Sequence, residues 1–268
     1  MNEGKRLLKV ILILTLVMGG LTIGLLYASG QREKNNIYIV VNPDTMKLVQ
    51  LEKPENGDPI AIIDTTEGEI RIVLYPEQSP EAVKNFTELA NSGYYDNTYI
   101  FESRDGKYCG GGTPAKNGSV GKKTNEHIKR ELHQDLWPFR GAVCMVQTDY
   151  VRTFKQKVLG GGTYYNGSRF YILNSIDFTD DIISDLKENS ASPELADAFV
   201  EKGGIPNFSQ QMTIIGQTYE GFDVIEKLSS LEGKKTGKYI TPTDDVMIRS
   251  ITISTYSNED DERSTGKK

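Results

Sequence analysis

The stretch Ala61-Ile62-Ile63-Asp64-Thr65-Thr66-Glu67-Gly68-Glu69-Ile70-Arg71-Ile72-Val73-Leu74-Tyr75 decides the fold. It predicts two β-strands joined by a tight turn at Glu67-Gly68. In the second strand, Ile70, Ile72 and Leu74 alternate with Arg71 and Val73, which is the period of a half-buried strand. The stretch is therefore expected to form an antiparallel hairpin.

A helix is predicted directly after this hairpin. Ser79 is placed to cap free backbone N–H groups, Pro80 suits the first helical position, and Glu81 favours the positive end of the helix dipole. One face is apolar, and Gly93 ends the helix; the apolar residues are Ala82, Val83, Phe86, Leu89 and Ala90. A further strand is predicted from Tyr99 to Cys109, stopping at Gly110-Gly111-Gly112.

These segments resemble the cyclophilin-type peptidyl-prolyl isomerases, particularly their bacterial members. The likeness continues in order over residues 58–256, and its most specific pieces are Ser92-Gly93-Tyr94-Tyr95-Asp96, Arg140-Gly141-Ala142-Val143-Cys144-Met145, Gly167-Ser168-Arg169-Phe170-Tyr171-Ile172 and Glu220-Gly221-Phe222-Asp223-Val224-Ile225. The resemblance implies a mainly β fold with helices, namely a closed antiparallel β-barrel capped by helices. It also implies rotamase activity on proline-containing polypeptides without a cofactor.

The N-terminal residues 1–30 predict a membrane anchor or a cleaved signal peptide. Lys5-Arg6 precedes an apolar run from Val10 to Tyr27, long enough for a transmembrane helix, and the basic residues favour a cytoplasmic N-terminus. Ala28-Ser29-Gly30 offers small residues for a signal peptidase. Both interpretations place the rest of the chain outside the cytoplasm, either attached to the cell membrane by a single span or secreted.

Residues 31–57 are polar and turn-rich and are predicted as a linker, with an optional short strand at 37–41. Residues 58–256 form the cyclophilin-like domain, and residues 257–268 are expected to be a disordered charged tail.

The charge and composition of the chain limit the classes of ligand and partner that it is expected to bind. A net charge of −6 without a long basic run gives no reason to expect nucleic acid. The two histidines, His127 and His133, stand in no cluster with ligand spacing, so no metal site is expected. Cys109 and Cys144 are predicted to be buried free thiols, although export would permit a disulfide.

Rotation about a prolyl bond needs no nucleophile, because the barrier is amide resonance of about 18–20 kcal/mol. The family resemblance implies an apolar pocket for the proline and an arginine that stabilises the twisted amide. An ungapped register through Thr98 and Gly111-Gly112 places Glu102 at this arginine, Phe101 at the histidine beside it and Gly110 at the assisting glutamine. The residue predicted at the catalytic position thus carries a negative charge, whereas the family resemblance implies a positive one.

The remaining site residues come from the same resemblance. Tyr171 takes the place of a pocket phenylalanine, and the expected substrate-binding set is Phe101, Glu102, Met145, Gln147, Tyr171, Phe208 and Met212. Two arginines are candidates for the missing cation. Arg104 shares a strand face with Glu102, since side chains repeat every second residue, and Arg169 replaces a family glutamine. An exposed Glu102–Arg104 ion pair without a functional role is the alternative.

Two insertions complete the pattern. Residues 148–165 are expected to form a solvated loop, or an aromatic and basic rim of the substrate groove. Residues 180–202 are expected to be helical, with Ser192-Pro193-Glu194 opening the second helix. The main hypothesis is an isomerase for exported proteins, weakened by Glu102. The alternatives are a non-catalytic proline-peptide chaperone or scaffold of the cell envelope, and a purely structural envelope component.

Overall fold

The predicted hairpin is present in the computed structural model, which describes residues 2–34, 38–120, 127–159 and 162–258. Strands β1 (Pro59–Thr65) and β2 (Gly68–Leu74) pair antiparallel, from Ile60 opposite Val73 to Thr65 opposite Gly68. Ile70 and Ile72 are fully buried, as their alternation predicts. Gly68 has a φ of 139°, and a Cβ there would lie 2.7 Å from Val224, so this turn needs glycine.

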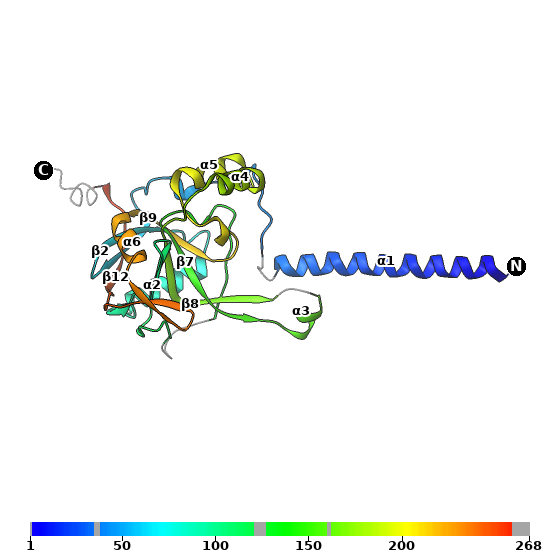
Figure 1. Cartoon of the computed structure of the whole chain (residues 1–268), viewed down its shortest axis with the longest axis horizontal. Helices are drawn as coiled ribbons and strands as arrows, with labels where there is room; N and C mark the ends of the chain where they lie inside the picture. Colours follow the sequence, from blue (N-terminus) through cyan, green and yellow to red (C-terminus); the bar gives the residue numbers. More distant parts are fainter. Residues whose placement is uncertain (1, 35–37, 121–126, 160–161, 259–268) are drawn as a thin grey trace.

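The main sheet is a curled, open sheet (Figure 1). Its order is β3-β12-β1-β2-β9-β7-β8-β5-β4, with β6 paired to β8. The remaining strands are β3 (Thr98–Tyr99), β4 (Glu102–Arg104), β5 (Tyr108–Gly111), β6 (Ile128–Lys129), β7 (Ala142–Val151), β8 (Thr163–Leu173), β9 (Ile214–Glu220) and β12 (Met247–Thr255). The predicted closed barrel is wrong. The end strands β3 and β4 are only two and three residues long, and among the described residues they do not pair with each other. An isolated bridge between Tyr99 and Thr113 connects β3 to the residues that follow β5.

The strand predicted from Tyr99 to Cys109 is interrupted by a turn. Asp105 and Gly106 both have positive φ, 46° and 74°, so the chain reverses there and β4 pairs with β5. Asp-Gly is a strong hairpin signal, and reading the segment as one strand overlooked it. The turn matters for the site because it sets Glu102 directly opposite Gly110.

Helix α2 (Pro80–Asn91) lies where predicted, with Ala82, Val83, Phe86 and Ala90 buried. Its cap differs from the prediction. Ser79 donates its hydroxyl to the Ile214 carbonyl, 2.7 Å away, instead of capping. The Glu131 carboxylate accepts from the backbone N–H groups of Glu81 and Ala82 at 3.2 and 2.9 Å. A distant residue thus supplies the charge that suits a helix N-terminus.

The predicted insertion helices are confirmed as α4 (Asp180–Asn189) and α5 (Pro193–Lys202), and the Ser192 hydroxyl accepts from the Leu195 N–H at 3.2 Å. Helix α6 (Phe222–Ser229) follows β9, and the short helices η1 (Val49–Leu51) and η2 (Pro206–Phe208) complete the domain. A separate two-stranded sheet pairs β10 (Gly233–Thr236) with β11 (Tyr239–Pro242).

Residues 148–159 and 162–165 extend β7 and β8 into a long arm with α3 (Phe154–Leu159) near its tip (Figure 1). The pairing continues to Val151 opposite Thr163, and Tyr150 stacks on Tyr164 with ring centroids 4.3 Å apart. Strand pairing and this stack therefore replace most of the loop that the sequence predicts here.

Helix α1 (Asn2–Lys34) covers the N-terminal apolar run. In the part of the chain that the structure describes, no helix combines the length and the apolar character of a membrane span. The transmembrane helix expected from the sequence is thus not confirmed.

Part of the predicted linker packs on the domain. The buried Gln50 side-chain amide donates to the Trp137 backbone carbonyl and to Gln217 Oε1, both at 2.9 Å. Its carbonyl oxygen accepts from the Trp137 backbone N–H at 2.5 Å. No strand forms at 38–41; residue 37 and the tail from 259 onward lie outside the described residues.

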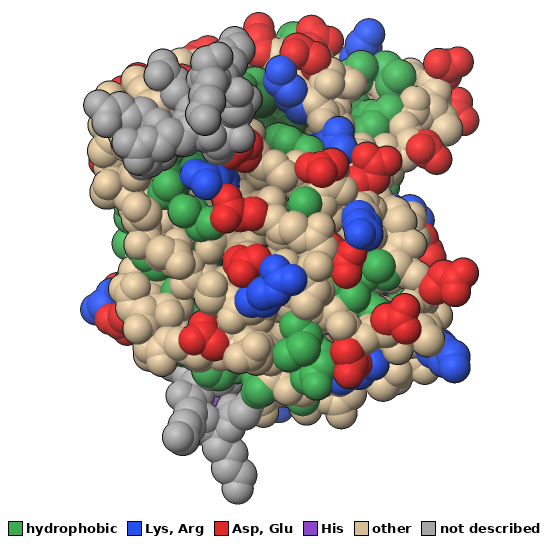
Figure 2. All heavy atoms as spheres, turned by 90° about the vertical axis from the view of Figure 1, so that its left-hand side faces the viewer, with side chains coloured by type: hydrophobic (Ala, Val, Ile, Leu, Met, Phe, Trp, Pro, Cys, Tyr) green, Lys and Arg blue, Asp and Glu red, His purple; other side chains and the backbone are tan. Residues whose placement is uncertain are grey.

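Cys109 and Cys144 are free and buried, as predicted. Burial raises the pKa of Cys109 to about 12 and also raises the pKa of Cys144. On the surface opposite α1, acidic and basic side chains are interspersed without a large field of one sign (Figure 2).

Candidate functional site

The candidate site is centred on Glu102, whose side chain is 1% exposed. Its Oε1 accepts from Arg104 Nε at 2.8 Å and from Arg104 Nη2, so the predicted same-face pair is present. Its Oε2 accepts from the Tyr171 hydroxyl at 3.2 Å. Both carboxylate oxygens are therefore engaged, and the buried charge is compensated by a guanidinium.

Arg104 lies at the edge of this buried group, with 29% of its side chain exposed. Burial lowers its pKa, but the hydrogen bond and the charge of Glu102 outweigh burial, and the pKa is raised overall. Its Nη2 also donates to the Lys238 carbonyl at 3.1 Å. Its guanidinium is close enough to the Tyr108 hydroxyl for a side-chain hydrogen bond, which helps to raise the pKa of Arg104. Arg104 is thus a fixed, permanently charged donor next to an aromatic ring.

Gly110 makes room for the ring that covers Glu102. A Cβ at this position would lie 2.9 Å from the Tyr171 ring and 3.0 Å from the Phe101 ring. The absence of a side chain at Gly110 thus lets Tyr171 approach the strand and reach the carboxylate. Burial, followed by the charge of Glu102, raises the Tyr171 pKa, so the hydroxyl stays protonated and donates.

Four partly buried side chains form a surface that we call the aromatic wall: Tyr108, Tyr171, Phe208 and Met212. The rings of Tyr108 and Tyr171 are 4.8 Å apart, and those of Tyr108 and Phe208 are 5.8 Å apart. All four pack on one apolar cluster that includes Leu136 and Ile214. The predicted pocket residues Tyr171, Phe208 and Met212 therefore pack on the same apolar cluster, where the Tyr108 ring contacts both Tyr171 and Phe208.

Arg169 is held away from this wall. It is 8% exposed, and its Nη1 donates to the Gly118 carbonyl at 2.8 Å and to the Tyr239 hydroxyl at 2.6 Å. Tyr239, on β11, packs edge-on against Phe101 with ring centroids 4.8 Å apart. Both predicted site residues, Arg169 and Phe101, are therefore covered by the chain itself.

The last two predicted residues also lie apart from the wall. Met145 is 1% exposed and packs in the main core beside Phe170. Gln147 is exposed on β7, beyond a break in the register with β8. Neither lies in the cluster that carries the aromatic wall.

Sequence reasoning missed two residues of the site. Tyr108 has a local signal, since it stands two residues before Gly110 on one strand and so shares its face. Tyr239 has none, because it reaches Phe101 and Arg169 from β11, far along the chain. Among the described residues no group of three histidine, cysteine or carboxylate side chains is arranged to hold a metal ion.

Comparison with known proteins identifies the family. The family model "Cyclophilin type peptidyl-prolyl cis-trans isomerase/CLD" matches residues 60–253, which is more than half of the chain. The chain belongs to the cyclophilin family. Its Glu102 and Gly110 thus stand in a cyclophilin fold, in which the resemblance leads one to expect arginine and glutamine.

This cyclophilin is similar to several bacterial proteins. It is 28% identical over 206 residues to a Staphylococcus saprophyticus protein provisionally named a peptidyl-prolyl cis-trans isomerase, covering 76% of this chain and 96% of the relative. A Streptococcus pyogenes protein, provisionally named a bifunctional phosphatase/peptidyl-prolyl cis-trans isomerase, is 27% identical over 213 residues, which is 78% of this chain and 41% of that protein.

The fold is also similar to a solved structure. A Cryptosporidium parvum cyclophilin-type isomerase, crystallised in the presence of the dipeptide Ala-Pro, superposes with a TM-score of 0.52 at 23% identity. The match covers 74% of this cyclophilin and 99% of the parasite chain. It supports the shared fold.

Proposed function

We propose that this cyclophilin catalyses prolyl cis-trans isomerisation on exported polypeptides, with the aromatic wall holding the proline ring and Arg104 stabilising the twisted amide. The observation that carries the proposal is the position of Arg104, whose guanidinium lies beside Tyr108 at the edge of the wall. Twisting removes amide resonance and concentrates electron density on the nitrogen, which a cation stabilises.

Arg104 is better placed than Arg169 to be the cation that stabilises the twisted amide. Arg169 is covered by Tyr239 and donates to two groups of the chain itself, so a substrate amide has no access to it without movement of β11. Arg104 keeps 29% of its side chain exposed. The ion pair with Glu102 offsets part of its charge, which is the physical reason to expect a weak catalyst.

Action on exported polypeptides is part of the proposal and rests on the sequence. Lys5-Arg6 followed by the apolar run from Val10 is typical of segments that direct a chain out of the cytoplasm. Accessibility of the domain to a protease added outside intact cells tests this part, and complete protection would contradict it.

The chemical test is a protease-free isomerisation assay on the full chain. Arg104→Ala is expected to lower kcat/KM by about tenfold to a hundredfold, because it removes a donor to the developing charge. Arg71→Ala is the matched control: Arg71 donates from Nε to Glu69, two residues before it on β2, over the same 2.8 Å. An activity that survives Arg104→Ala unchanged refutes the role of Arg104.

A non-catalytic holding module is the second candidate. It is favoured by one observation, the engagement of both Glu102 oxygens with Arg104 and Tyr171, which partly neutralises the only cation we place at the wall. Saturable binding of proline peptides without any rate acceleration would support this candidate and contradict the isomerase.

A further inference from the structure

A cavity of about 450 Å³ lies between the α4–α5 insertion and η2. Its lining includes the apolar side chains of Trp137, Leu186, Leu195 and Phe199. Its polar lining residues are Asp185, Asn189, Ser190, Asn207, Ser209 and Gln210. This volume falls in the range of about 300–1,000 Å³ that ligand sites occupy. The cavity thus has the size and the lining of a binding site for apolar side chains.

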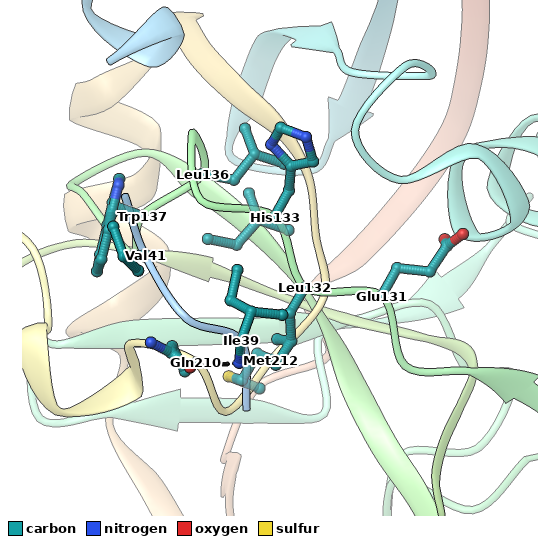
Figure 3. A pocket seen from close by; sticks show the side chains of 10 residues that line it. Ile39, Val41, Glu131, Leu132, His133, Leu136, Trp137, Gln210 and Met212 are labelled. Carbon is teal, nitrogen blue, oxygen red and sulfur yellow. Dashed lines mark hydrogen bonds between the residues drawn. The ribbon is translucent and has the colours of Figure 1, made fainter. Parts of the chain in front are cut away.

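The cavity is a neighbour of the aromatic wall. A smaller hollow shares Val41, Trp137 and Gln210 with it and reaches Met212, which belongs to the wall (Figure 3). Helix η2 links them a second time, since Pro206 lines the cavity and Phe208 packs against Tyr108. Because Pro206 and Phe208 are two residues apart on η2, the cavity lies close to a polypeptide bound at the wall.

The chain itself shows how an extended segment lies on this surface. Ile39 and Val41 line the smaller hollow, whereas Val40 between them is 72% exposed, which is the alternation of an extended chain. The Ile39 N–H donates to the Gln210 side-chain carbonyl at 2.8 Å (Figure 3). The surface thus accepts aliphatic side chains and satisfies a backbone donor at once.

Trp137 lies at the same place. It is 6% exposed, lines both hollows, and its indole N–H has no hydrogen-bond partner among the described residues. A buried donor left unpaired costs about 1–3 kcal/mol. The N–H itself is covered by neighbouring atoms, so Trp137 is a buried reporter beside the cavity and its N–H is closed to a bound chain.

We propose that this cavity binds the residues of a client polypeptide that flank its proline, in an extended conformation, with aliphatic side chains in the cavity. The inference rests on the proposed function, because it gives the same site its substrate preference. The cavity would thus favour prolines in apolar, unfolded segments over prolines in polar segments.

The only tryptophan of the chain makes the test direct, because its emission reports on the cavity. The full chain is titrated with an aromatic-free peptide that carries one proline flanked by Leu and Val, and with the same peptide flanked by Ser and Gly. We expect a saturable change in Trp137 emission with the apolar peptide and an affinity about tenfold weaker for the polar one, since a few methylene groups lose their burial.

Two neighbouring substitutions locate the effect. Both residues are exposed, but Asn189→Phe adds bulk to a residue that lines the cavity, whereas Glu188→Phe adds the same bulk to a neighbour outside the lining. Asn189→Phe is expected to lower the affinity for the apolar peptide about tenfold, and Glu188→Phe is expected to bind this peptide with the affinity of the unchanged chain. Equal affinity of both variants for the apolar peptide overturns the proposal.

Isomerisation of the same peptides separates this inference from the proposed function. Acceleration of the apolar peptide without a change in Trp137 emission refutes the cavity and leaves the isomerase standing. A saturable emission change without acceleration supports the cavity and refutes the isomerase.

Discussion

Replacing Glu102 by glutamine is expected to raise the isomerase activity. The substitution keeps the shape of the side chain and an oxygen that accepts from Tyr171 or Arg104, but it removes the negative charge that offsets the guanidinium. Arg104 would then present its full charge to the substrate amide.

The size of the effect follows from the distances. Arg104 Nε lies 2.8 Å from Glu102 Oε1. An amide nitrogen at hydrogen-bond distance on the other side of the guanidinium would lie about 8 Å from the carboxylate, because the width of the guanidinium adds to the two hydrogen bonds. At an effective dielectric constant of about 20, two unit charges at about 8 Å interact by about 2 kcal/mol, so roughly a third of a charge on the nitrogen gives about 0.7 kcal/mol. Its removal predicts an increase of about threefold in kcat/KM.

The assay is protease-free isomerisation of a proline peptide by the full chain, with thermal unfolding of each variant measured alongside. Glu69→Gln is the control at an exposed ion pair, because Glu69 also accepts from an arginine Nε, that of Arg71 on β2, at 2.8 Å and lies outside the aromatic wall. An unchanged or lower rate for a folded Glu102→Gln variant would refute the view that the carboxylate masks Arg104. It would instead make Glu102 a residue that positions the arginine.

Three further predictions concern the fold that carries the site. Gly110→Ala is expected to lower the stability by about 1–3 kcal/mol in thermal or chemical unfolding, because a Cβ there lies 2.9 Å from the Tyr171 ring; an unchanged midpoint contradicts this close packing. Burial raises the pKa of Glu131, so the folded state binds its proton more tightly than the unfolded state and stability falls as pH rises through the region just above 4.5; Glu131→Gln should remove this dependence in unfolding titrations. Cys109 and Cys144 are expected to react with a thiol reagent only as fast as the protein unfolds, and rapid labelling of the native state would show that these thiols are accessible.

Local patterns in the sequence predicted the parts of the fold that depend on near neighbours. The alternation of Ile70 and Ile72 identified the β1–β2 hairpin, and Ser192-Pro193 identified the start of α5. The same-face relation of Glu102 and Arg104 followed from the strand period alone. In each case the residues concerned lie within a few positions of one another.

Contacts between distant segments were not predictable in this way. The cap of α2 comes from Glu131 and the cover of Arg169 comes from Tyr239, and both depend on how remote loops pack. The resemblance implied a closed barrel, whereas the very short β3 and β4 leave the sheet open. The Asp105-Gly106 turn was visible in the sequence and was overlooked.

The contact between a substrate proline and the aromatic wall tests the central claim most directly. In a chain labelled at its methionine methyl groups, a bound proline peptide is expected to give nuclear Overhauser effects from the proline ring to Met212, in the wall, and none to Met145, which is 1% exposed in the core. A saturating peptide whose proline ring gives no such effect to Met212 would contradict the account.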